Sequence, residues 1–221
     1  MREWRKPQSF RAQSVASSFT ITADKMDKRF VGSLPIEDWS WQIGVIVGRS
    51  GTGKTTIAKQ LFPADYIRGF EYGAETILDD FPEGLSVSEI TRALCCVGFS
   101  SPPDWLKPYA VLSQGEKMRV DVARALLLAE KRVVFDEFTS VVDREVAKIA
   151  SLAISKAVRR SNKQFIAVTC HRDILDWLEP DWVFDTDDMT FDKKKESIRR
   201  LNSKFSKLSV NSGDCLGTII I

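Results

Sequence analysis

Two adjacent runs of residues most constrain how this chain can fold. The first is short and apolar, and the second, directly after it, is rich in glycine and contains a lysine. Residues 43–47 (IGVIV) have the character of a buried strand, and residues 54–62 have a helical pattern. The run GRSGTGKT between them has the spacing G-x-x-x-x-G-K-[ST] of a phosphate-binding loop. Its glycines let backbone N–H groups converge on phosphate oxygens, and the following helix directs its positive end at the same anion. This pattern predicts a nucleotide site formed by Gly48, Arg49, Ser50, Gly51, Thr52, Gly53, Lys54, Thr55 and Thr56.

Apolar runs alternate with helical patterns along the rest of the chain. Residues 132–135, 165–169 and 182–184 read as further strands, and helices are expected over residues 142–159 and 173–178. Such alternation is the βαβ signature of a sheet flanked by helices. We therefore expect an α/β fold of the P-loop NTPase type, with a mixed sheet and one main domain.

Two adjacent acids end the predicted strand RVVF. Asp136 is expected to hold Mg²⁺ together with Thr55, and Glu137 to polarise an attacking water as general base. Lys54 is expected to bridge the β- and γ-phosphates of ATP. A solvated helix cap is the alternative for the two acids, but the loop upstream favours a catalytic pair. ATP and Mg²⁺ are thus the expected cofactors, and the expected reaction is ATP hydrolysis.

A third motif stands before that strand, and with it the chain resembles the ATP-binding-cassette (ABC) type ATPases. The run LSQGEKMRVDVARALL is similar to the signature of that family and the helix after it. The resemblance implies that Ser113, Gly115 and Glu116 bind the γ-phosphate held by a second subunit, so that an ATP-dependent homodimer completes each site. Two shorter matches follow in the family's order. Residues 140–143 (SVVD) stand in the place of its D-loop, and His171, the only histidine, stands in the place of its switch histidine, where it helps to arrange the water.

The chain departs from transporter ATPases in the region between the loop and the signature. Ser113 follows Lys54 by only 59 positions, so the helical subdomain, expected at about residues 82–128, is shortened. No glutamine occurs between Gln60 and Gln114, and the family's Q-loop glutamine is therefore missing. Asp80, or its neighbour Asp79, is a candidate substitute as metal ligand; a strand end and turn is the equal alternative. An aromatic residue upstream of the loop contacts adenine in this family. Phe30, Trp39 and Trp41 are the candidates here, and Phe30 has the most suitable spacing.

The composition limits the range of partners and compartments. Lys and Arg total 32 against 30 Asp and Glu, so the net charge of +2 gives no global reason for a nucleic-acid or membrane partner. The four cysteines have neither disulfide-framework nor zinc-site spacing. No run approaches the roughly 20 apolar residues of a membrane span. A cytoplasmic protein without membrane insertion is expected, with a basic arm at 1–17, the ATPase domain at 18–190 and a basic tail at 191–221.

Three functions remain open at this point. A nucleotide-driven dimerising engine for a soluble partner or process comes first, because the helical subdomain is short and the Q-loop glutamine is missing. A nucleotide-binding subunit of an ABC transporter is the second. An ATP-gated DNA-binding or repair ATPase is the third, since the basic tail and N-terminal arm could contact nucleic acid. The sequence most resembles a non-transporter branch found fused to, or beside, predicted acetyltransferases. The stretch after Phe184 is too short for such a domain, so that activity is expected either on another polypeptide or not at all.

Overall fold

The structure is a computed structural model, which describes residues 9–18 and 34–194. The chain divides into two units, residues 1–38 and residues 39–221, and each is described by itself. The first contains the helix α1 (Phe10–Ser18), which the sequence did not predict. Among the described residues, all the other helices and strands lie in the second unit. Of the helices in the described ranges, none is both long enough and apolar enough to span a bilayer.

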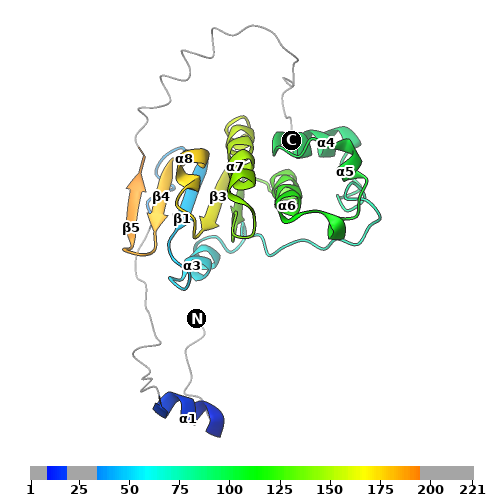
Figure 1. Ribbon diagram of the computed structural model, residues 1–221. Coiled ribbons are helices and arrows are strands. Elements are labelled where there is room, and N and C mark those ends of the chain that lie inside the picture. Colours follow the sequence, from blue (N-terminus) through cyan, green and yellow to red (C-terminus); the bar gives the residue numbers. More distant parts are fainter. Residues whose placement is uncertain (1–8, 19–33, 195–221) are drawn as a thin grey trace. The chain divides into compact units, whose positions relative to one another are not determined.

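One five-stranded sheet organises the second unit (Figure 1). Its strands are β1 (Ile43–Val47), β2 (Arg132–Phe135), β3 (Gln164–Thr169), β4 (Trp182–Asp185) and β5 (Thr190–Lys193), in the spatial order β2-β3-β1-β4-β5. The first four run parallel, and β5 pairs antiparallel with β4 at the edge. The predicted mixed α/β sheet is therefore confirmed, and β5 is an addition that its polar, exposed sequence did not reveal.

The centre of the sheet depends on a close contact between two strands. Every residue of β1 is buried. Gly44 lies opposite Trp182 in the parallel register, and a Cβ on this glycine would stand only 2.1 Å from the indole ring. Trp182 is itself fully buried and meets Trp41 edge to face at a centroid distance of 5.3 Å. Only glycine leaves room for this packing.

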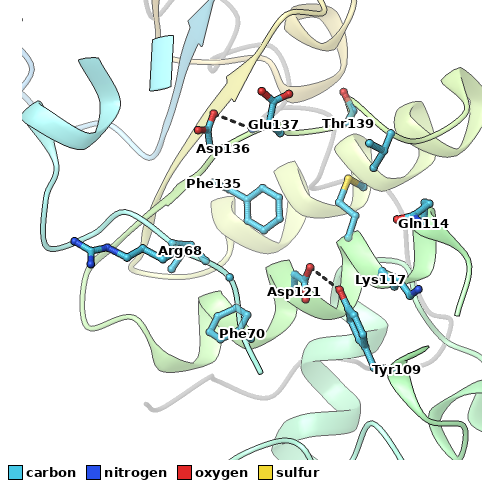
Figure 2. Close-up of a pocket in the computed structure, with 14 residues that line it drawn as sticks. Arg68, Phe70, Tyr109, Gln114, Lys117, Asp121, Phe135, Asp136, Glu137 and Thr139 are labelled. Carbon is cyan, nitrogen blue, oxygen red and sulfur yellow. Dashed lines mark hydrogen bonds between the residues drawn. The ribbon is translucent and has the colours of Figure 1, made fainter. Parts of the chain in front are cut away.

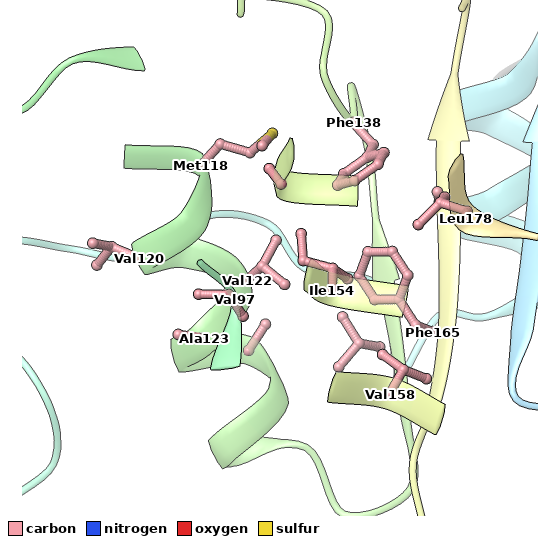
Figure 3. Packing of buried hydrophobic residues seen from close by; sticks show 14 of the residues in the cluster. Val97, Met118, Val120, Val122, Ala123, Phe138, Ile154, Val158, Phe165 and Leu178 are labelled. Atoms are coloured by element: carbon pink, nitrogen blue, oxygen red, sulfur yellow. The ribbon is translucent and has the colours of Figure 1, made fainter. Parts of the chain in front are cut away.

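Helices cover the sheet and connect it to a separate group of helices. The helix α3 (Lys54–Leu61) follows β1, α7 (Arg144–Arg159) follows β2, and α8 (Ile174–Leu178) follows β3. Ile154 of α7 lies between Val122 of α6 and Phe165 of β3, and Val158 of α7 lies beside Phe165 (Figure 3). One apolar core therefore runs from the sheet through α7 to the helical group.

The helical group consists of α4 (Val87–Cys96), α5 (Pro102–Trp105), the 3-10 helix η1 (Tyr109–Val111) and α6 (Gln114–Leu128). Both α4 and α6 begin with a capping box, in which a serine and the glutamate three residues later bind each other's backbone N–H. At the other end of α6, the buried Lys163 donates to the carbonyl oxygens of Leu126 and Ala129. These contacts fix both ends of α6.

Most of the expected helix and strand bounds lie within one residue of those in the structure, and two expectations differ by more. The helix after β2 begins at Arg144 instead of 142, because Asp143 is its N-cap and accepts from the N–H of Glu145 at 2.9 Å. Residues 74–81 form bends and turns, so the strand end of the alternative is wrong, whereas the turn that it placed directly afterwards is present at residues 83–84. The segment upstream instead makes an isolated parallel bridge, in which Tyr66 pairs with Val134 at the free edge of β2.

Substituting Gly44 tests the packing of Trp182. Gly44→Ala is expected to destabilise the fold by about 1–3 kcal/mol, because the indole ring must move out of a fully buried place. Gly73→Ala is the matched control, since a Cβ there has no neighbour within 4 Å. The measurement is the midpoint of urea unfolding, and equal midpoints for the two variants would contradict the packing described here.

Candidate ATP site

The phosphate-binding loop connects β1 to α3, as the sequence predicts. Gly48, Gly51 and Gly53 have φ values of 153°, 81° and 95°, which other residues rarely adopt. Gly53 is also the N-cap of α3 and offers no side-chain cap. The first N–H groups of α3 therefore have no side-chain acceptor at the cap, and with the positive end of the helix they suit an anion. The loop thus fits a phosphate group.

The side chains of the loop bind its own backbone. Lys54 Nζ donates to the carbonyl oxygen of Arg49 at 2.8 Å, and Thr52 Oγ1 donates to the same oxygen at 2.9 Å. Lys54 therefore reaches back over the loop, where its ammonium group adds positive charge beside the N–H groups. Thr55 is half-buried and Thr56 exposed in the first turn of α3.

The turn between β4 and β5 supports this loop, a contact that sequence reasoning missed. Asp187 accepts hydrogen bonds from the backbone N–H and the Nε of Arg49, at 3.0 and 3.1 Å, and from Arg172 at 2.9 Å. The N–H of Arg49, more than any other contact, lowers the pKa of Asp187 to about 2. Beside it, Thr186 shares a 2.6 Å hydrogen bond with Thr52, and a Cβ on Gly48 would stand 2.2 Å from the Thr186 hydroxyl.

The two acids predicted at the end of β2 lie side by side (Figure 2). Asp136 accepts from the phenolic O–H of Tyr66 and from the N–H of Glu137, the latter at 2.9 Å. Partial burial and the bond to Asp136 raise the pKa of Tyr66, so this phenol stays protonated and donates. Tyr66 thereby fixes the carboxylate expected to hold Mg²⁺. No motif pointed to it, because its place follows from the bridge to Val134.

The residues after Asp136 have an unusual backbone. Glu137 and Thr139 have φ values of 54° and 64°, in the left-handed region that non-glycine residues seldom occupy. The exposed Glu137 carboxylate accepts from Ser140 at 2.6 Å. Such strain persists where surrounding structure enforces it, and it is concentrated at functional sites. The turn therefore agrees with a functional role for the predicted general base.

His171 lies close to this turn. Its Nδ1 is 3.4 Å from Thr139 Oγ1, and its backbone N–H donates to Thr169 at 3.1 Å. The structure therefore brings the predicted switch histidine beside the loop that carries Glu137. The D-loop match, residues 140–143, continues that loop into α7.

The signature residues form the start of α6. Ser113 is the N-cap, and Glu116 accepts from its N–H and hydroxyl at 2.8 and 2.7 Å. Glu116 thus has a structural role within the capping box, which its assignment as a nucleotide contact did not anticipate. Gly115 has a second role as well, because a Cβ there would stand 2.6 Å from Val146 of α7. None of the hydrogen bonds of Ser113 or Glu116 reaches loop residues 48–55 of the same chain.

A cavity of about 300 Å³ lies between the end of β2 and the start of α6 (Figure 2). Asp136 and Glu137 line one side, and Gln114 and Lys117 of α6 line another. Below them, the partly buried Asp121 accepts from the hydroxyls of Tyr72 and Tyr109, at 2.6 and 2.9 Å. The cavity therefore joins the strand-end acids to the helix that carries the signature.

The roles expected of all these site residues remain predictions, including those of Asp80 and Phe30. Asp80 Oδ1 accepts from the N–H groups of Gly73 and Ala74, at 2.8 and 3.1 Å, so it stabilises its own turn. Its Oδ2 is buried and has no hydrogen-bond partner within the described residues, which leaves one oxygen for a metal. Phe30 lies outside the described residues.

Comparison with known proteins shows which proteins this chain is similar to. No protein-family profile matches the chain. The chain is 24% identical over 206 residues to methionine import ATP-binding protein MetN 1 of Pseudomonas putida, covering 74% of this chain and 60% of that protein. It is 28% identical over 213 residues to energy-coupling factor transporter ATP-binding protein EcfA1 of Staphylococcus aureus, covering 79% and 74%. The fold is similar to that of a bacterial Atm1-family ABC exporter solved with ATP bound, with a TM-score of 0.55, 19% identity, and coverage of 79% of this chain and 38% of the exporter chain.

This chain contains an ABC-type P-loop ATPase domain. A domain of this type is an ATPase, and its cofactors are ATP and Mg²⁺. Both relatives are named as ATP-binding proteins of transport systems, so the expected non-transporter branch stays a prediction. In the described ranges, no group of three or more His, Cys, Asp or Glu side chains could hold a metal ion. Mg²⁺ does not need such a cluster of side chains, because it is usually bound by one or two protein oxygens together with phosphate oxygens and water.

Replacing Asp187 tests the support of the phosphate-binding loop in the ABC-type domain. Asp187→Asn removes the charge that holds Arg49, so we expect ATP to bind several-fold more weakly, measured with a fluorescent nucleotide. Asp188→Asn is the control in the same turn, because Asp188 bonds to Thr190. Since the pKa of Asp187 is lowered from 3.8 to about 2, the support is complete above about pH 4 and is lost as pH falls toward 2. Equal affinities for the two variants would show that the turn does not support the loop.

Proposed function

We propose that two copies of the ABC-type domain close on two ATP molecules and that hydrolysis reopens the pair. The observation that carries this is that one chain presents two separate helix starts suited to anions. Loop residues 48–55 lead into α3, and Ser113 begins α6, but the hydrogen bonds of Ser113 stay within α6. A second copy supplies the missing half, with Ser113 and Gly115 facing the nucleotide on the loop of its partner.

The side chains of each site divide the work of hydrolysis. Lys54 binds the β- and γ-phosphates, while the Thr55 hydroxyl and Asp136 hold Mg²⁺, which neutralises charge developing on the phosphates. Glu137 takes a proton from the attacking water, and Ser140 orients its carboxylate through their 2.6 Å bond. His171 lies beside the same turn and helps to position the water or the γ-phosphate. The role of each residue in this scheme is a proposal.

Replacing Glu137 tests the dimer and the base together. Glu137→Gln keeps an acceptor for Ser140 but removes the base, so turnover should fall by roughly 10²–10⁴-fold. With ATP and Mg²⁺ the variant is expected to elute as a dimer in size-exclusion chromatography. Adding Lys54→Ala to it should abolish nucleotide binding and restore the monomer, and Glu145→Gln, an exposed acid in the first turn of α7, is the control. A Glu137→Gln chain that stays monomeric at saturating ATP would refute the two-chain site.

The relatives favour a transport system as the partner. Both are named as ATP-binding proteins of transport systems, which favours a nucleotide-binding subunit over the soluble engine that the sequence placed first. One observation still supports a soluble partner as the second candidate. Residues 74–81, where the Q-loop glutamine is missing, form turns tied to Asp80. The similarities give no support to the DNA-binding alternative.

Membrane association separates the two candidates. Glu137→Gln protein, held in the ATP state, is expected to sediment with membranes of its own cells, and the Glu137→Gln, Lys54→Ala protein is expected to remain in the supernatant. A membrane partner also predicts a neighbouring gene for a polytopic membrane protein. If the ATP-bound variant stays in the supernatant and co-elutes with a soluble protein, the transport proposal fails and the soluble candidate replaces it.

A further inference from the structure

The guanidinium group of Arg144, the first residue of α7, is held on several sides. Its Nε donates to Asp173 Oδ2 at 2.9 Å, and its Nη2 donates to Asp173 Oδ1. Its plane also lies over the ring of Trp177, at 5.2 Å from the ring centroid. A two-point bond to a carboxylate together with an aromatic contact fixes both the position and the orientation of a guanidinium group.

The remaining nitrogen, Nη1, points at His171. It lies 3.0 Å from His171 Nδ1. An arginine side chain carries only donors and does not lose its proton in proteins. Nδ1 must therefore accept, and a neutral His171 carries its proton on Nε2. Thr139 Oγ1, at 3.4 Å from the same Nδ1, is a hydroxyl that can donate as well, so it agrees with this assignment.

We propose that Arg144 is a positioning residue that holds His171 as the Nε2–H tautomer. His171 then offers a hydrogen-bond donor, and no basic nitrogen, on the side of the ring away from Arg144. Proton abstraction from water is left to Glu137, and His171 donates to a phosphate oxygen or to the oxygen of the water. The catalytic consequence rests on the role proposed above for His171, whereas the tautomer assignment rests on the Arg144 contact alone.

The tautomer can be read directly, because His171 is the only histidine in the chain. In untagged protein labelled with ¹⁵N-histidine, at mildly alkaline pH, one imidazole gives one pair of nitrogen signals. We expect Nδ1 to give the signal of an unprotonated nitrogen and Nε2 that of a protonated one. Arg144→Met removes the donor and should produce a mixture of the two tautomers. Lys148→Met, on the exposed part of the same helix, should leave the signals unchanged.

The kinetics of ATP hydrolysis give a second test of the role of Arg144. In Arg144→Met the kcat for ATP hydrolysis is expected to fall roughly ten-fold or more, with a much smaller change in KM, because His171 in the other tautomer cannot donate from Nε2. For comparison, leaving the histidine of a Ser-His-Asp triad in the wrong tautomer lowers kcat by about 10⁴-fold. Asp173→Asn frees Arg144 without touching the imidazole, and it should shift the tautomers in the same direction even if Arg144→Met folds poorly.

Two results would overturn the assignment: a proton on Nδ1 in the unmodified chain, or tautomers that stay the same in both Arg144→Met and Asp173→Asn. A different result addresses the proposed function. If His171→Ala hydrolyses ATP at the normal rate while the tautomer still depends on Arg144, the structural contact stands and the catalytic role of His171 fails.

Discussion

The parallel pairing of β1 with its two neighbours is the constraint on which the site depends. Val47, the last residue of β1, is in register with Thr169 of β3 and with Asp185 of β4. The strand β2 joins the same set through β3. Since parallel strands end at the same edge, the residues that follow them converge there. The phosphate-binding loop, the strand-end acids, His171 and the turn before β5 therefore meet although they are distant in sequence.

A set of polar contacts then orients the residues that meet at this edge of the sheet. Asp187 holds the backbone of Arg49, Tyr66 holds Asp136, and Arg144 faces His171. Ion pairs at a protein surface each add little to the free energy of folding. Their effect here is geometric, because each of the three fixes a group expected to touch the nucleotide or the water. The left-handed turn at Glu137 and Thr139 needs such support, since strained backbone persists only where its surroundings enforce it.

Most of the fold and the framework of the site could be predicted from the sequence because these features are local. The strands Ile43–Val47 and Arg132–Phe135 have the predicted bounds, and the loop after the first and the acids after the second lie where expected. The contacts that were missed join residues far apart in the chain. Tyr66 and Asp136 are 70 positions apart, and Arg49 and Asp187 are 138 apart. No local pattern marks such partners, because their approach is set by strand order and by packing. β5 was missed since an exposed edge strand has no apolar alternation.

The residues at the start of α6, which resemble a nucleotide-binding signature, also have a structural role in helix packing. The capping box of Ser113 and Glu116 fixes the first turn, so the N–H groups of that turn keep one direction. In the same first turn, Gly115 allows Val146 of α7 to approach so closely that no larger residue fits without a shift. The helix α7 begins two residues before Val146, at Arg144, whose guanidinium group faces His171. The surface proposed to meet the nucleotide of a second copy is therefore packed directly on the helix that orients the histidine of its own site. Because close-packed interiors transmit small displacements, a shift of the surface at the start of α6 would also displace α7, and a shift of α7 would displace that surface.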